Sequence, residues 1–325
     1  MTDLSLVDVG PLVGGRGDVE GVARALDQAC RHVGFFAVTG HGVDHSLQTR
    51  LDVAARDFFA RPDEEKAAVA MERAGPAWRG WFPLGGELTS GRPDHKEGLY
   101  FGVDLAPDDP RVVAGRPLHG PNLWPSEPTE LREAVTAWMD AMLGLGQALL
   151  GGLALGLGLS RDFFVRHLTT DPTVLFRIFH YPPVDQEGWG VAEHTDYGLL
   201  TILAQDHQGG LQVRGPEGWV DVEPEPGVLV CNLGDMLDRM TGGRYRSTPH
   251  RVRPSAHASR MSFPFFLDPS WDAEVRPIVA GGDAPPDDAA TRWDGTSLQH
   301  LSGTYGDYLT AKVAKVFPRL GNPVS

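Results

Sequence analysis

The chain has 325 residues and a formal net charge of −14 at pH 7. This acidic balance argues against nucleic acid or an anionic membrane as the main partner, because both attract clustered Lys and Arg. The chain is 41% hydrophobic and 22% charged, which excludes a mainly disordered protein, and its two cysteines exclude a disulfide framework.

The first part of the chain predicts helices around a few strands. We expect strands at residues 4–9 and 34–38, and helices at about 18–32 and 46–59. Residues 74–128 are rich in Gly, Pro, Trp and Asp. A long loop-rich insertion of this kind is typical of a lid or a pocket wall.

A long helix is predicted at about 128–157, followed by a short one at 160–167. Within it, residues 141–159 are nearly uncharged and long enough to span a bilayer. However, this stretch continues an amphipathic run and has a single basic residue, Arg161, close to one end. We therefore expect a buried central helix and no membrane partner.

Short strands follow one another from residue 173 to 268, separated by Gly-rich turns, and a last helix is expected at 302–316. This pattern is typical of an antiparallel sandwich or jelly roll. We predict one domain, mainly β with surrounding helices. Residues 1–172 form its helical N-terminal part, 173–268 its jelly-roll core and 269–325 its C-terminal segment and helix.

Candidate metal ligands lie in that core. His194 and Asp196 are two residues apart, so on a strand both would face the same side. A second cluster of polar residues supplies His250. Two histidines and one carboxylate form the facial triad of non-haem Fe(II) oxygenases, which leaves adjacent positions open for other ligands.

Arg260 and Ser262 repeat the two-residue spacing. A guanidinium binds a carboxylate in bidentate fashion, and a hydroxyl adds one hydrogen bond. The intervening segment 254–259 predicts a turn that places His250 and Arg260 on neighbouring strands. A metal-bound keto acid with a distal carboxylate on Arg260 has the shape of 2-oxoglutarate.

The chain resembles the isopenicillin N synthase-like group of Fe(II)/2-oxoglutarate-dependent oxygenases. The matching segments are GFF at 34–36, HGV at 41–43, HYPP at 180–183, HTD at 194–196, NLGDML at 232–237, GRYRSTPHRV at 243–252 and RMS at 260–262. The resemblance implies a double-stranded β-helix core and iron ligands His194, Asp196 and His250. It also implies that Arg260 and Ser262 anchor 2-oxoglutarate and that Tyr181 reaches the carboxylate of the cosubstrate or substrate. One departure is Phe179, where plant members often carry an Asn.

Other residues have two interpretations each. We expect a substrate pocket lined by aromatic side chains, with core packing or an apolar cover of the barrel mouth as the alternative: Trp78, Trp81, Tyr100, Phe101, Phe179 and Phe265. Asn232 and Asp235 are expected to hold a turn through bonds to the backbone.

The sequence thus predicts a dioxygenase that couples oxidative decarboxylation of 2-oxoglutarate to oxidation of an unactivated C–H bond, by default hydroxylation. The products beside the oxidised small organic molecule are succinate and carbon dioxide. Three alternatives stay open: an isopenicillin N synthase-type oxidase that uses dioxygen without 2-oxoglutarate, a non-catalytic jelly roll that binds a small acid, and a zinc hydrolase. The protein is expected to be a cytoplasmic monomer or weak homo-oligomer.

Overall fold

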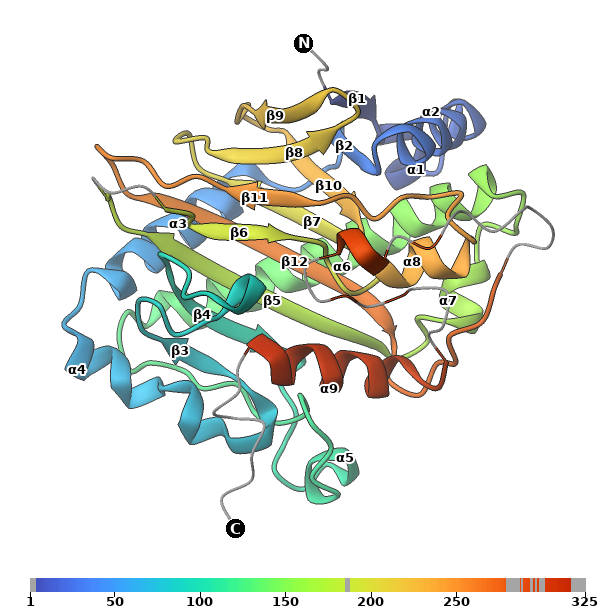
Figure 1. Ribbon diagram of the computed structural model, residues 1–325. Coiled ribbons are helices and arrows are strands. Elements are labelled where there is room, and N and C mark those ends of the chain that lie inside the picture. The colour runs from blue at the N-terminus through green and yellow to red at the C-terminus, as the bar shows by residue number, and fades with distance from the viewer. Residues whose placement is uncertain are drawn as a thin grey trace.

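A computed structural model describes residues 4–184, 188–278 and 302–316, together with 287, 289–292, 295 and 297. In this part of the chain the strands form an eight-stranded sheet in the order β1-β2-β10-β7-β12-β5-β4-β3 and a four-stranded sheet in the order β6-β11-β8-β9 (Figure 1). The strands are β1 Ser5–Asp8, β2 Phe35–Thr39, β3 Gly80–Phe82, β4 Glu97–Gly102, β5 Pro172–Tyr181, β6 Val191–His194, β7 Leu200–Gln205, β8 Leu211–Gly215, β9 Gly218–Val222, β10 Leu229–Leu233, β11 His250–Val252 and β12 Arg260–Ser270. The predicted strand-rich core with surrounding helices is confirmed.

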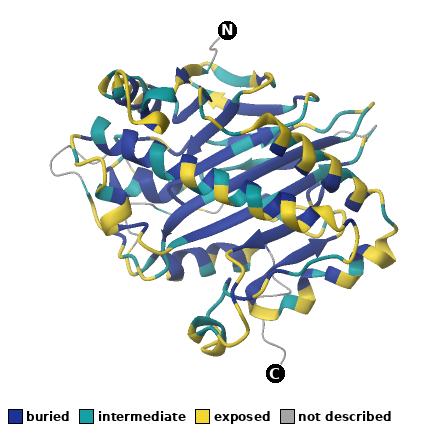
Figure 2. Cartoon of the chain, turned by 180° about the vertical axis from the view of Figure 1, so that it is seen from behind, coloured by how far each residue is buried: buried dark blue, intermediate teal, exposed yellow. Residues whose placement is uncertain are grey.

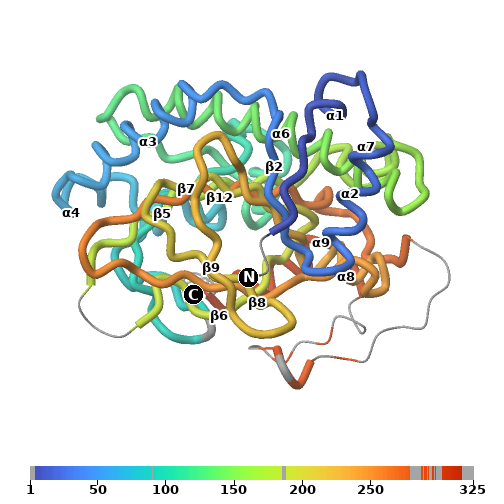
Figure 3. The backbone as a smooth tube through the Cα atoms, turned by 90° about the horizontal axis from the view of Figure 1, so that it is seen from above, coloured from blue at the N-terminus to red at the C-terminus, as the bar shows by residue number. Residues whose placement is uncertain are grey.

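Helices cover the outer face of the large sheet, and the small sheet lies against its inner face. Seen from above, α3 and α6 run along one side of β5, β7 and β12, while β6, β8 and β9 lie on the other (Figure 3). The helices are α1 Gly10–Gly14, α2 Val19–His32, α3 His45–Phe59, α4 Asp63–Lys66, α5 Pro110–Val113, α6 Glu130–Gly156, α7 Phe163–His167, α8 Asp235–Met240 and α9 Tyr305–Val316. The helix expected at 302–316 is α9, whereas most of the segment from 279 to 301 and residues 317–325 lie outside the described residues.

The helix α6 is the central helix of the outer layer. Of the described helices, it alone is long and apolar enough to cross a membrane. Its Leu131, Trp138 and Leu149 side chains are nevertheless fully buried, and it packs against α2, α3 and β12. A Cβ at Gly146 would lie 2.7 Å from a methyl group of Leu267, so this glycine allows close contact between helix and sheet. Figure 2 shows the resulting layers, with buried strands beneath helices whose outer faces are exposed.

The alternation of side chains along β5 and β12 decides what faces the space between the sheets. Tyr181 pairs with Arg260, and Phe179 pairs with Ser262. All four of these side chains line the same cavity. Phe265 has the opposite parity, is fully buried and does not line the cavity. The expectation that Phe265 lines the pocket was therefore wrong, and Pro264 and Phe266 occupy that face instead.

Candidate metal centre and active-site cavity

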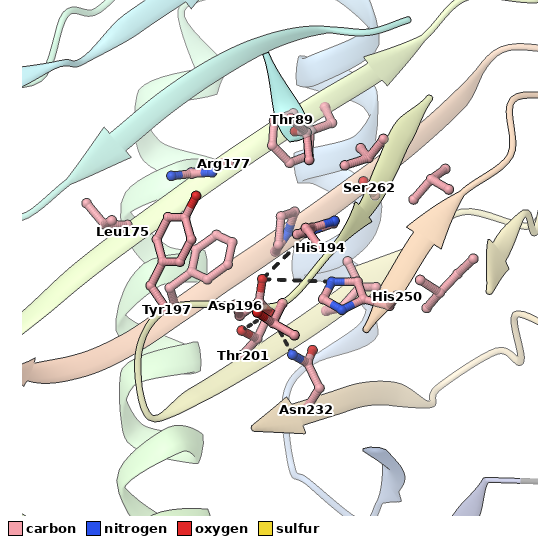
Figure 4. A pocket seen from close by; sticks show the side chains of 18 of the residues that line it. Thr89, Leu175, Arg177, His194, Asp196, Tyr197, Thr201, Asn232, His250 and Ser262 are labelled. Atoms are coloured by element: carbon pink, nitrogen blue, oxygen red, sulfur yellow. Dashed lines mark hydrogen bonds and ion pairs between the residues drawn. The ribbon is translucent and has the colours of Figure 1, made fainter. Parts of the chain in front are cut away.

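Three predicted ligands converge between the two sheets. The ligand atoms of His194, Asp196 and His250 all lie within 4.8 Å of one another. The Oδ1 atom of Asp196 is 3.9 Å from Nε2 of His194 and 3.8 Å from Nε2 of His250 (Figure 4). Two imidazole nitrogens and one carboxylate oxygen suit a ferrous ion and leave coordination positions open toward the cavity.

Hydrogen bonds to the backbone orient both imidazoles. The Nδ1 atom of His194 lies 2.8 Å from the carbonyl oxygen of Ala192, and Nδ1 of His250 lies 3.3 Å from that of Thr248. A ring that donates from Nδ1 presents an unprotonated Nε2 to a metal. Burial and the neighbouring His250 lower the pKa of His194 to about 3, so this imidazole is neutral and able to bind a metal at neutral pH.

The second oxygen of Asp196 is held by two neutral donors. The hydroxyl of Thr201 and the side-chain amide of Asn232 both donate to Oδ2, each at 2.6 Å. Burial raises the pKa of Asp196, but the two histidines and these hydrogen bonds outweigh it and lower the pKa. The carboxylate is thereby kept ionised, with Oδ1 directed to the metal position.

The loop that carries Asp196 is fixed by the first turn of α8. The backbone N–H of Asp235 donates to the carbonyl of Asp196 at 2.8 Å, and that of Met236 donates to the carbonyl of Gly198 at 3.1 Å. A Cβ at Gly234 would lie 2.4 Å from that Gly198 oxygen, so the approach requires a glycine. The NLGD segment therefore serves the metal site by holding the ligand loop in place.

Arg260 is a buried cation at one end of the cavity. It is 1% exposed, its Nε donates to the carbonyl of Gly209 at 2.6 Å, and one Nη donates to Gln205 at 3.1 Å. Its other Nη is buried without a partner, and among the described residues no carboxylate forms an ion pair with it. This unpaired donor fits the distal carboxylate of 2-oxoglutarate.

Ser262 and Tyr181 lie next to this arginine. Their hydroxyl oxygens are 3.5 Å apart, and the Arg260 guanidinium lies 5.0 Å from the centre of the Tyr181 ring. Both residues line the cavity together with Arg260. The three side chains predicted for the cosubstrate are thus adjacent, and the triad opens onto the same space.

The cavity contains about 910 Å³ of space not filled by protein atoms, its open mouth included. The insertion at 74–128 does form part of its wall, but through polar residues: Glu87, Thr89 and Lys96. Of the expected aromatic residues only Phe179 lines it. The expectation was wrong for Trp78, Tyr100 and Phe101, which line a separate small pocket, and for Trp81, whose indole donates to Glu97.

Three local expectations are corrected. His194 ends β6 and Asp196 lies in the following loop, so the loop and not strand alternation brings them together. His250 and Arg260 lie on opposite sheets, because β11 pairs with β6 and β8 whereas β12 pairs with β5 and β7. Asn232 was expected to stabilise a turn, but it lies in β10 and its side-chain amide donates to Asp196. Its position two residues before a glycine gave no sequence signal for this contact.

A jelly roll with an open two-histidine, one-carboxylate site and an unpaired arginine in one cavity defines a non-haem iron oxygenase. Residues 4–127 match the family model "non-haem dioxygenase in morphine synthesis N-terminal", and residues 172–269 match the 2OG-Fe(II) oxygenase superfamily.

Relatives agree with this class. The chain is 43% identical to a probable iron/ascorbate oxidoreductase of Dictyostelium discoideum, over 93% of this chain and 91% of that protein. It is 33% identical to a homoarginine-6-hydroxylase of Arabidopsis thaliana, over 98% and 90%. A crystal structure of a 2OG-Fe(II) oxygenase family protein of Caulobacter crescentus superimposes with a TM-score of 0.81 at 27% identity, over 97% and 99%. The chain belongs to the 2OG-Fe(II) oxygenase superfamily and is an Fe(II)- and 2-oxoglutarate-dependent enzyme of its isopenicillin N synthase-like branch.

Proposed function

We propose that this enzyme hydroxylates an unactivated C–H bond of a small organic molecule and releases succinate and carbon dioxide. The observation that carries the proposal is the combination, in one cavity, of the open triad and the buried Arg260 with an unpartnered Nη. The relative described as a homoarginine-6-hydroxylase supports hydroxylation as the outcome.

The side chains of the cavity have separate roles in binding the metal and the cosubstrate. His194, Asp196 and His250 would hold Fe(II), and Arg260 with Ser262 would hold the distal carboxylate of 2-oxoglutarate. The bound iron and keto acid supply oxidative decarboxylation coupled to C–H oxidation. Thr201 and Asn232 keep Asp196 ionised and oriented, and we assign no side chain as general acid or base.

Apolar side chains form much of the cavity wall, and with a substrate bound they would limit the access of water to the metal position. Leu203, Leu211 and Val252 contribute apolar surface near the two sheets, and Leu309 and Val316 of α9 close the other side. A water-poor site confines oxidation to a substrate held in the cavity. We propose a single small molecule of ordinary metabolite size as the occupant.

The test is a screen of small molecules for substrate-stimulated succinate formation by the Fe(II)-loaded protein. We expect at least one compound to give succinate and an oxygenated product in equal amounts, only in the presence of dioxygen. Product without succinate would instead support an oxidase that uses no 2-oxoglutarate, and turnover without dioxygen would support a hydrolase. Asp140→Asn, at the surface of α6, serves as a control variant with unchanged turnover.

We also propose a cytoplasmic location and a monomeric or weakly associated state. Both described cysteines, Cys30 and Cys231, are unpaired and buried, which is compatible with a reducing compartment. Cell fractionation and sedimentation of the purified protein test the two statements.

A further inference from the structure

The cavity has a second arginine, at the end opposite Arg260. Arg177 lies on the same face of β5 as Tyr181, four residues away, and Tyr181 pairs with Arg260. At roughly 3.3 Å per residue the two positions are about 13 Å apart along the strand. In Figure 4, Arg177 lies with Leu175 and Tyr197 on one side of the triad, and Ser262 lies on the other. The metal position is therefore between the two arginines.

Two aromatic rings hold the Arg177 guanidinium in place, but its N–H groups have few hydrogen-bond acceptors. Its guanidinium lies over the ring of Tyr100 at 4.3 Å and over that of Phe266 at 4.9 Å. Its nearest carboxylate oxygen, on Glu87, is 3.6 Å away, which is too far for a hydrogen bond. Nε is buried without a partner, and Arg177 donates no hydrogen bond to any residue that the structure describes. Such a buried cation is stabilised by a ligand that supplies acceptor oxygens.

The carboxylates near Arg177 are held more closely by other partners. The carboxylate of Glu87 is already bound by the Lys96 ammonium at 2.8 Å and by the Tyr100 hydroxyl at 2.7 Å. Lys96 also contacts Asp94 at 2.5 Å, and burial together with nearby Glu87 raises the pKa of Asp94 despite this contact. The Lys96 ammonium thus lies closer to Glu87 and Asp94 than Arg177 does to Glu87, at 3.6 Å. Arg177 therefore has only a loose ion pair and keeps donors that a ligand carboxylate can use.

We propose that Arg177 binds a carboxylate of the primary substrate, so that the enzyme oxidises a carboxylic acid. The inference rests on the proposed function, because it names the substrate class of the same cavity. The apolar body of the acid would pack on Leu175, Phe266 and Leu309, which line this end. Its carbon chain would then extend from Arg177 toward the metal position.

Calorimetric titration under anaerobic conditions tests the proposal without turnover. The Fe(II)-loaded protein is first saturated with 2-oxoglutarate, so that Arg260 is occupied. Hexanoate, 4-phenylbutyrate and indole-3-propionate are then titrated, each beside its own primary amide. We expect at least one acid to bind ten times more tightly than its amide. A panel in which no acid binds more tightly than its amide, including one in which nothing binds, overturns the proposal.

Variants separate recognition from folding. Arg177→Gln should reduce the preference for acid over amide to less than twofold, whereas Arg177→Lys should keep part of it. The matched control is Arg79→Gln, because Arg79 is also buried but donates to the carbonyl of Leu118 and does not line this cavity. A preference that survives in Arg177→Gln, or that Arg79→Gln abolishes equally, refutes the assignment. If Arg177→Gln does not fold, the wild-type panel and Arg177→Lys decide, since Lys retains the charge but loses the fork of donors.

The same titration distinguishes the two proposals. If 2-oxoglutarate itself does not bind to the Fe(II)-loaded protein, the proposed function fails. If it binds but no acid is preferred, the proposed function stands and only the role of Arg177 is refuted.

Discussion

The metal affinity should depend on two neutral side chains that never touch the metal. Thr201 and Asn232 each donate to Oδ2 of Asp196 at 2.6 Å. Thr201→Val and Asn232→Leu keep nearly the same volume and remove one donor each. A hydrogen bond to a charged group contributes about 1.5–3 kcal/mol, and 1.4 kcal/mol corresponds to about tenfold in affinity. We therefore expect each variant to weaken Fe(II) binding about 10- to 100-fold.

The assay is anaerobic titration of metal-free protein with Fe(II). Asn122→Leu is the matched control: Asn122 is a buried asparagine whose amide bonds the backbone of Gly102, away from the site. This control should lose stability but keep its Fe(II) affinity. Affinities of Thr201→Val and Asn232→Leu that stay within threefold of wild type would show that the two hydrogen bonds to Asp196 do not support metal binding. An equal loss in Asn122→Leu would contradict the prediction as well.

Two further predictions concern β12. Burial raises the pKa of Asp268 from 3.8 to about 7. The folded protein therefore holds this proton more tightly than the unfolded chain does. The free energy of unfolding should fall as pH rises from about 4 to about 7, by up to roughly 4 kcal/mol. Asp268→Asn keeps an acceptor for the Tyr305 hydroxyl and should flatten that profile in urea unfolding between pH 5 and 8, whereas an unchanged slope would contradict the assigned shift. Phe265→Ala should cost about 3–5 kcal/mol of stability, because the ring is fully buried among the helices, without changing the affinity for 2-oxoglutarate; a loss of that affinity at full stability would mean that Phe265 faces the cavity after all.

The main elements could be predicted from the sequence because their signals are local. The periodicity at 18–32 and 46–59 corresponds to α2 and α3, and the first strand of the run predicted at 173–268 corresponds to β5. The two-residue spacing correctly placed Arg260 and Ser262 on one face, since both lie within β12. Local pattern is sufficient where one regular element carries both residues.

The sequence was insufficient where partners come from distant segments. The pairing of strands is not local, so nothing in residues 250–260 indicated that the chain crosses from the small sheet to the large one. The same holds for Asn232, which meets Asp196 only because β10 lies beside β7. Phe265 was misplaced by parity alone, since even-numbered positions of β12 face the cavity.

The sequence also led us to expect too many aromatic side chains in the wall of the substrate pocket. Large aromatic residues in an insertion indicate burial but not the side on which they are buried. Tyr100 and Phe101 line a separate small pocket. The indole of Trp81 donates to the buried carboxylate of Glu97, which also pairs with Lys66. The polar side chains Glu87, Thr89 and Lys96, which composition alone would assign to the surface, line the cavity instead.

An anaerobic titration of the Fe(II)-loaded protein with 2-oxoglutarate, followed by visible absorption, tests the metal site and the cosubstrate site together. Chelation of the ferrous ion by the keto acid should produce a weak charge-transfer band that saturates at one equivalent. The band should be absent in Asp196→Ala and should require at least tenfold more 2-oxoglutarate in Arg260→Ala. A protein that forms no such band, or an Arg260→Ala variant with wild-type affinity, would contradict the assignment of the metal and cosubstrate sites.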